Sequence, residues 1–249
     1  MSGLLAVVPV IGERRLPSPP AQIGLASMLA EGSALGLAAI ELLVVDNTRL
    51  GLNPDYVRDH LPGVAIYRDP DGHNLGVARS WNVGARAVLD RGLDYLVLLS
   101  SVVQFGPILH CTWRSQMETF WGERVIEAEG HSWHLIALHR TVLEGVGLFD
   151  SNFYPAYVEA EDYSFRMRQL GWEGGWTRVW VNALSQGHGL HVPLVSCPWG
   201  PLGAYRAAKW GGGKHEETFT LPFGDKPLDY FEDVPIPELA RRYGLEVWW

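Results

Sequence analysis

The chain has 249 residues, of which 47% are hydrophobic and 19% are charged. These values suit one packed domain with a sizeable core, and they exclude a chain that is disordered throughout. The formal net charge of −8 argues against broad nucleic-acid binding, because that needs a basic surface to neutralise phosphates. Two widely spaced cysteines, Cys111 and Cys197, indicate reduced thiols in a cytoplasmic protein. No apolar run approaches the roughly 18 residues of a membrane span, so none is expected.

Strands and helices alternate over the first part of the chain. Buried apolar runs predict strands at 3–10, 40–47, 64–68 and 93–99. The stretches between them predict helices at 21–38, 53–61 and 74–90. This alternation predicts an α/β fold, in which helices flank a mostly parallel sheet.

The second half of the chain is less regular. We expect a helix at 107–121, a strand at 131–140, a short helix to Gly145, an amphipathic helix at 161–172 and a strand at 174–184. From about residue 186 onward, glycine, proline, histidine and tryptophan dominate, which predicts loops with little regular structure. We therefore expect a main unit, residues 1–185, and a C-terminal extension, residues 186–249, within one globular unit.

Polar residues follow two of the predicted strands, at the sheet edge where ligands gather in open α/β folds. Asp46 and Asn47 end the second strand. They either accept hydrogen bonds from a base or ribose, or they form a turn. The fourth strand ends in Ser100 and Ser101, so hydroxyls stand where a charged group is common.

The helix at 74–90 carries Arg79 and Asn82, three residues apart. The two side chains share a helix face and either reach one ligand or serve as a solvated arginine and a structural asparagine. Neither the G-x-G-x-x-G pattern nor the P-loop pattern occurs in the chain, which disfavours dinucleotide and P-loop sites.

Four acids lie close together at Asp150, Glu159, Glu161 and Asp162. Neighbouring carboxylates raise one another's pKa, which suits one of them to take a proton. The alternative is that they occupy the first turn of a helix, where the helix dipole favours acids.

The C-terminal extension holds histidines and basic residues. His188 and His191 are spaced to bind a metal, or one of them contacts a phosphate. Arg206, Lys209 and Lys214 flank a glycine-rich stretch. They form either a flap that closes positive charge over a diphosphate or a surface loop.

Taken in order, these segments resemble the family 2 glycosyltransferases of the GT-A fold, especially the rhamnosyltransferase-like branch. The resemblance is carried by "AVVPV", "VVDN", "NLGVARSWNVGARAVL", the strand at 93–99, "HLIALHRTVLEGVGLFD" and "FYPAYVEAEDYSFRMRQLGW". The segments "SSVVQFGP" and "KWGGGKHEETFTLPFG" look like a subgroup encoded by actinobacterial bacteriophages. That subgroup implies the host cytoplasm as location and an acceptor such as a virion protein.

The resemblance implies an inverting transferase of the hexosyltransferase type, with a UDP-, dTDP- or GDP-linked sugar as donor. The acceptor would be a hydroxyl of a glycan or a protein. By this resemblance, carboxylates just before the helix at 161–172 supply the catalytic base. The donor would be bound at the matching positions, which are Pro9, Val10, Asp46, Asn47, Asn74, Arg79 and Asn82.

Two departures from the family pattern stand out. The family's D-x-D motif, which binds Mg²⁺ or Mn²⁺, is replaced by Ser100, Ser101 and Val102, and hydroxyls are poor ligands for these ions. Arginine and lysine residues such as Lys209 are then expected to hold the diphosphate without a tightly bound metal.

The second departure is in the family's E-D-x-D motif, which reads here as Glu159, Ala160, Glu161 and Asp162. The base is then Glu159, Glu161 or Asp162, or the protein is inactive. The alternative to an enzyme is a catalytically silent module that binds a sugar nucleotide or a glycan. A nicotinamide-dependent oxidoreductase is a third and weaker hypothesis, because the G-x-G-x-x-G pattern of dinucleotide-binding sites is absent.

Overall fold

The computed structural model describes most of the chain. The described residues are 3–12, 17, 19–34, 41–101, 103–105, 113–130, 132–172, 176–180, 183–185 and 198–245. No helix within these ranges combines the length and apolar character that crossing a membrane requires.

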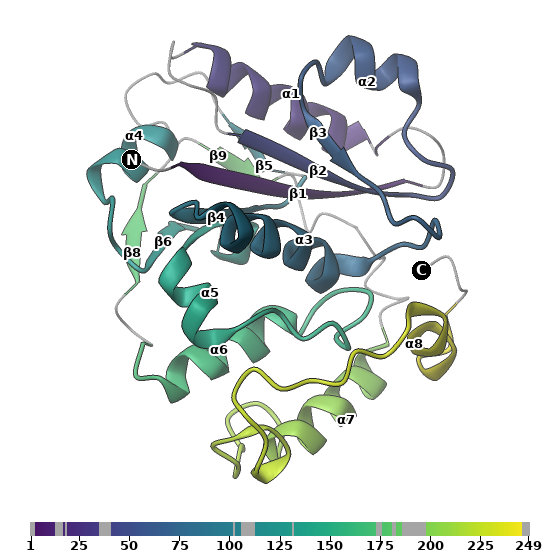
Figure 1. Cartoon of the computed structure of the whole chain (residues 1–249), viewed down its shortest axis with the longest axis vertical. Helices are drawn as coiled ribbons and strands as arrows, with labels where there is room; N and C mark the ends of the chain where they lie inside the picture. The colour runs from purple at the N-terminus through teal and green to yellow at the C-terminus, as the bar shows by residue number, and fades with distance from the viewer. Residues whose placement is uncertain are drawn as a thin grey trace.

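A seven-stranded sheet forms the centre of the molecule, in the order β3-β2-β1-β4-β7-β6-β8 (Figure 1). Neighbours among β1, β2, β3 and β4 pair in parallel, as do β6 and β8. Strand β7 runs antiparallel to both β4 and β6. The strands are β1 (Leu4–Gly12), β2 (Glu41–Thr48), β3 (Ala65–Tyr67), β4 (Tyr95–Leu99), β6 (Val125–Ala128), β7 (Leu135–His139) and β8 (Thr177–Val179).

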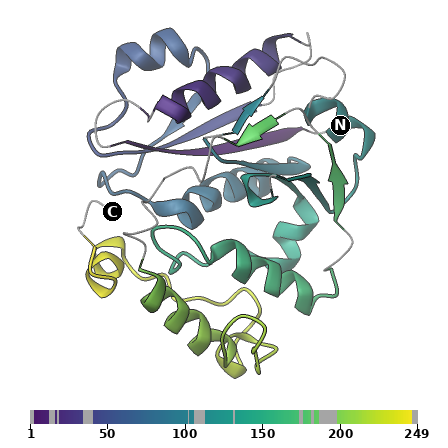
Figure 2. The same cartoon turned by 180° about the vertical axis from the view of Figure 1, so that it is seen from behind.

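Helices cover both faces of this sheet, as Figures 1 and 2 show from opposite sides. One face carries α1 (Pro19–Ala34) and α2 (Pro54–His60), and the other carries α3 (Gly76–Arg91), α5 (Arg140–Val146) and α6 (Glu159–Gln169). Helix α7 (Trp199–Trp210) lies on the side of α6 away from the sheet, followed by α8 (Ile236–Arg242). The remaining elements are β5 (Val103–Phe105), α4 (Trp113–Thr119), η1 (Ser132–His134), β9 (Ala183–Ser185) and η3 (Pro222–Gly224).

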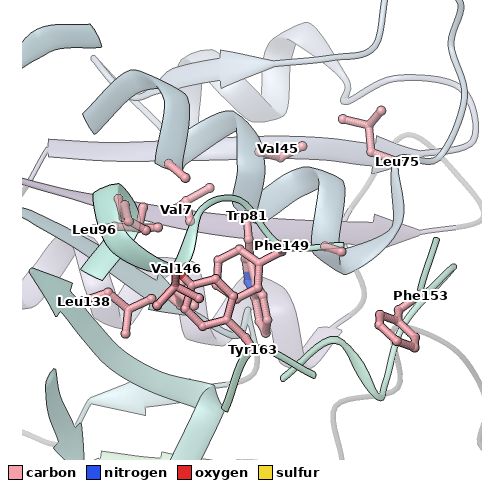
Figure 3. Packing of buried hydrophobic residues seen from close by; sticks show 14 of the residues in the cluster. Val7, Val45, Leu75, Trp81, Leu96, Leu138, Val146, Phe149, Phe153 and Tyr163 are labelled. Atoms are coloured by element: carbon pink, nitrogen blue, oxygen red, sulfur yellow. The ribbon is translucent and has the colours of Figure 1, made fainter. Parts of the chain in front are cut away.

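The core on the α3 side is held by a group of aromatic rings. Trp81 of α3 meets Phe149 edge to face at 5.1 Å between ring centroids, and Phe149 stacks on Tyr163 of α6 at 4.0 Å. Figure 3 shows these three side chains next to one another. Leu202 of α7 and Leu239 of α8 belong to the same buried cluster, so the C-terminal helices share a core with the sheet.

The predicted α/β class is confirmed, and the expected strands and helices of the first 100 residues are present. The predicted strand at 174–184 is divided into β8 and β9. Strands β5 and β6 were missed, because three or four residues are too few to show a periodic pattern.

The expectation of little regular structure after residue 186 is wrong, since α7 and α8 lie there. The glycines and prolines in this part of the sequence weaken the local signal for α7. The helix is stabilised by burial of Leu202, Arg206, Lys209 and Trp210. The packing of these side chains against the rest of the protein therefore outweighs the low helix propensity of the local sequence.

Gly84 permits the close approach of α3 to the sheet. A Cβ atom there would lie 2.8 Å from Cβ of Val7 and 2.9 Å from Cδ1 of Leu96. We expect Gly84→Ala to lower the free energy of unfolding by about 1–3 kcal/mol, measured by urea denaturation. Gly200→Ala in α7 is the control, because no described atom outside the backbone of its own helix lies within 4 Å of its added Cβ. An equal effect of the two changes would contradict this packing argument.

Candidate active site

A cavity of about 500 Å³ lies at the carboxyl ends of β1 and β4. Its sheet side includes Pro9 and Ser100. Its helix side includes residues 156–161, which lead into α6, together with Trp199 and Arg206 of α7. The cavity therefore lies at the sheet edge where open α/β folds bind their ligands.

An unusual backbone leads into α6. Tyr157 and Val158 have φ values of 73° and 66°, in the left-handed region that non-glycine residues rarely adopt. For the β-branched Val158 this conformation is strained, and strain of this kind clusters at functional sites. The turn makes Glu159 the first residue of α6 and places it in the cavity lining.

Glu159 combines burial with an unused hydrogen-bond acceptor. The residue is 4% exposed, and its Oε2 has no hydrogen-bond partner within the described ranges. Burial raises the pKa of this carboxyl to about 8, although backbone N–H groups of Glu159 and Tyr157 oppose the rise; nearby Glu161 adds to it. A carboxyl with a pKa near neutral pH is suited to exchanging a proton with a ligand hydroxyl.

Glu161 also lines the cavity but has a different environment. Its Oε1 lies 2.7 Å from Nζ of Lys214, and the two side chains are 43% and 54% exposed. Lys214 comes from the segment after α7 and lines the same cavity. The pair brings a cation to the cavity mouth, where solvent weakens the attraction between the two charges.

Asp162 belongs to a buried ion cluster that also contains Asp150, Lys209 and Arg166. Nζ of Lys209 lies 2.7 Å from Asp150 and 2.9 Å from Asp162, and Nε of Arg166 lies 3.0 Å from Asp162. Trp210 donates its indole N–H to Asp162 at 2.8 Å. Burial pushes the pKa of Asp162 up, but Lys209 and Arg166 outweigh it and hold that pKa below its usual value.

None of these four residues lines the cavity, and all four are fully buried. Asp162, a candidate base by sequence, and Lys209, a candidate diphosphate ligand, instead join α6 to α7. The cation that α7 presents to the cavity is Arg206, one helical turn before Lys209.

Arg206 is 5% exposed and pairs with Glu217 through Nη2. Its Nε and Nη1 have no hydrogen-bond partner in the described part of the chain. A buried guanidinium with unused N–H groups is a strong donor site for an anionic ligand.

The residues at the end of β2 organise the local backbone. Asp46 accepts hydrogen bonds from Thr48 and from the backbone N–H of Leu52, and it pairs with Arg68 at 3.3 Å. Asn47 donates to Ser80 and accepts from the N–H of Leu75. Both residues are buried, so they shape the turn rather than present free groups.

A second, smaller hollow adjoins these turns. It is lined by Pro9, Val10, Asn47 and Asn74, four of the residues matched to a donor site by sequence. Asn74 accepts a hydrogen bond from the N–H of Gly76 at the start of α3. The structure thus brings these four side chains together.

Arg79 and Asn82 both contact other parts of the protein. Arg79 pairs with Asp233 at 3.0 Å and donates to the carbonyl of Val234. Asn82 donates to the carbonyl of Phe149 and accepts from its N–H, at 2.7 and 2.8 Å. Asn82 therefore resembles a strand partner for residue 149, and neither side chain lines the cavity.

The end of β4 offers poor ligands for a tightly held divalent cation. Ser100 lines the cavity and Ser101 is buried, so the end of β4 offers hydroxyls. Within the described ranges, the group that brings three ligand atoms together is Asp69, Asp71 and His73, within 4.8 Å of one another. That D-x-D sequence follows β3 and was overlooked in the sequence, and it does not line the cavity. His188, predicted as a metal ligand, lies outside the described residues.

Comparisons with known proteins support the fold class. No family model matches the chain. Glucosyl-3-phosphoglycerate synthase of Mycobacterium tuberculosis superposes with a TM-score of 0.55 at 13% identity, over 92% of this chain and 91% of that one. A mannosyltransferase of Pyrobaculum calidifontis, solved with GDP-mannose and Mn²⁺, gives 0.50 at 13% identity, over 74% and 58%. These neighbours are GT-A-fold glycosyltransferases, and the chain shares their fold.

A short sequence match points to the same class. Over 37 residues the chain is 51% identical to a galactofuranosyl glycosyltransferase of Leishmania donovani. The match covers 15% of this chain and 8% of that protein, so the chain spans only a small part of that relative.

A structure of the mycobacterial synthase with Mn²⁺, UDP-glucose and phosphoglyceric acid aligns over 98% of this chain, with a TM-score of 0.53.

Glu159→Gln tests the protonation of the buried carboxyl. The pKa of this carboxyl is raised from 4.5 to about 8, so the folded protein favours the protonated form. The stability that this form contributes is fully present below about pH 4.5 and is lost as the pH rises through 8. Glutamine has no such loss. The melting temperature of the variant relative to wild type should therefore increase between about pH 5 and pH 9, by the equivalent of a few kcal/mol at most. Glu238→Gln, which changes a partly exposed carboxyl on α8, serves as control, and a pH-independent difference for Glu159→Gln would refute the raised pKa.

Asp162→Asn tests the structural role of the ion cluster. The change leaves the buried Lys209 and Arg166 without a full counter-charge, so we expect a loss of about 3–5 kcal/mol in unfolding free energy. Glu161→Gln, which breaks a partly exposed pair, should change it by no more than about 1 kcal/mol. Urea denaturation measures both. Unchanged stability with complete loss of turnover would instead make Asp162 a catalytic residue.

Proposed function

We propose that this protein is an inverting glycosyltransferase of the hexosyltransferase type, acting on a nucleoside-diphosphate sugar. The observation that carries the proposal is the buried Glu159 carboxyl, whose unpartnered Oε2 belongs to a residue lining the strand-end cavity of a GT-A fold. The neighbours solved with UDP-glucose and with GDP-mannose support donors of this class. The wide spacing of the two cysteines in the sequence supports a reducing, cytoplasmic location.

The sheet side and the helix side of the cavity take different parts of the reaction. The nucleoside part of the donor is assigned to the sheet side of the cavity, beside Pro9 and Ser100, because the adjoining hollow at Val10, Asn47 and Asn74 has a volume of only about 10 Å³. Pro9 lines both spaces, so the small hollow adjoins the sheet side of the cavity, where the donor is assigned. The acceptor, a hydroxyl of a glycan or a protein, enters beside Glu159 on the helix side.

Glu159 acts as the general base. Its ionised carboxylate takes the proton from the acceptor hydroxyl while that oxygen forms a bond to the anomeric carbon. The bond from this carbon to the diphosphate breaks on the opposite face, and the nucleoside diphosphate leaves with the electron pair. Lys214 is the cavity cation assigned to the charge that develops on the leaving group. No step is assigned to a metal, because the residues at the end of β4 do not fit one.

Glu159→Gln should leave the fold intact and lower the rate of sugar transfer by about 10²–10⁴-fold, the usual contribution of a general base. The measurement is release of UDP, dTDP or GDP from the corresponding sugar nucleotides, with EDTA and with Mn²⁺. Circular dichroism checks the fold. Full activity in Glu159→Gln would refute the base assignment. Donor binding without turnover in the wild type would favour a silent binding module.

A further inference from the structure

Arg206 is a cation that the proposed reaction leaves without a role. It is 5% exposed, and the N–H groups on Nε and Nη1 have no acceptor within the described ranges. Unused donors on a buried charge are unfavourable, whereas a hydrogen bond from a cation to an oxyanion is about twice as strong as a neutral one. The cavity that Arg206 lines is therefore suited to an acidic group.

The guanidinium is held in place before any ligand binds. Glu217 pairs with Nη2, and the two side chains are 6% and 7% exposed. The N–H groups of Thr218 and Phe219 both donate to the carbonyl of Trp210, which turns the segment after α7 back onto the helix. One turn along α7, Lys209 is fixed by Asp150 and Asp162. Little side-chain freedom remains to be lost on binding.

Two aromatic rings lie on the same helix side of the cavity. Trp199 precedes Arg206 by two turns of α7, which places both on one face of the helix. The ring of Trp199 meets that of Tyr157 at a centroid distance of 4.9 Å, and Trp199 is 47% exposed. Tyr157 and Glu159 belong to the same turn that leads into α6. Exposed aromatic faces of this kind can stack against the apolar face of a sugar ring.

We propose that the acceptor is an acidic sugar, whose carboxylate or phosphate binds Arg206 while its hydroxyl approaches Glu159. The sugar ring would lie against Trp199 and Tyr157. The inference deepens the proposed function and rests on it. An acceptor is favoured over the donor diphosphate because the rings of Trp199 and Tyr157, which can stack on a sugar, lie on the same side of the cavity as Arg206 and the proposed base.

Isothermal titration calorimetry on the full chain tests this site. The probes are glucose, glucuronate, glucose 6-phosphate and UDP, each titrated into wild type and into Arg206→Gln. Wild type should bind the two acidic sugars at least about tenfold more tightly than glucose. Arg206→Gln should remove that advantage and leave the affinities for glucose and UDP unchanged. Arg206→Lys, which keeps the charge, should restore part of it.

Arg242→Gln, which changes a partly exposed arginine on α8, is the control and should bind all four probes as wild type does. If Arg206→Gln is too unstable to titrate, Arg206→Gln with Glu217→Gln removes both charges of the buried pair, and the same loss is expected.

Three results would overturn the proposal. The first is equal binding of glucose and the acidic sugars by wild type. The second is an equal loss for all sugars in Arg206→Gln. The third is loss of UDP binding alone, which would place Arg206 at the donor diphosphate. Because these are binding measurements, they are independent of turnover. A wild type that binds acidic sugars through Arg206 but never releases nucleotide would refute the transferase and leave this site standing.

Discussion

Helices α6 and α7 are joined by charges that have no access to water. Asp150 and Asp162 share Lys209, and Asp162 also pairs with Arg166, so two carboxylates balance two cations inside the protein. Such a cluster is stable only while it is complete, because a single buried charge without its partner is strongly unfavourable. The cluster therefore fixes α7 against α6. The helix side of the cavity depends on it, since α7 supplies Trp199 and Arg206 while the turn before α6 supplies Glu159.

Glu159 and Asp162 illustrate how environment assigns roles to neighbouring acids. Both belong to the first turn of α6 and both are almost completely buried. Asp162 has cations and an indole N–H around it, so it stays ionised and structural. Glu159 is buried, and no cation of the described residues forms an ion pair with it, so its pKa rises to about 8. Pairs of carboxyls whose surroundings drive their pKa values apart are typical of sites that move protons.

The sequence predicts the sheet well because its strands are long apolar runs separated by helical patterns. It also predicts that Pro9, Val10, Asn47 and Asn74 lie close together, because the carboxyl ends of parallel strands meet at one edge of a sheet. Composition cannot show which cation of α7 is balanced internally. Lys209 and Arg206 are separated by one turn, and only the fold reveals that Asp150 and Asp162 engage the first. The structural role of Asn82 could not be predicted either, because its hydrogen-bond partner is the backbone of residue 149, far away in the sequence.

The contacts of Arg79 indicate that truncation of the C-terminal part would destabilise the protein. It joins α3, beneath the sheet, to Asp233 and Val234, close to the end of the described chain. Leu239, in the helix that follows, lies in the same core as Trp81. A fragment cut near residue 185 would lack Lys209, one of the four charges of the ion cluster, and would expose the apolar surface that Leu202 and Leu239 cover. The C-terminal quarter of the chain is therefore needed to complete the core, and a tag or fused partner is better added after it than put in its place.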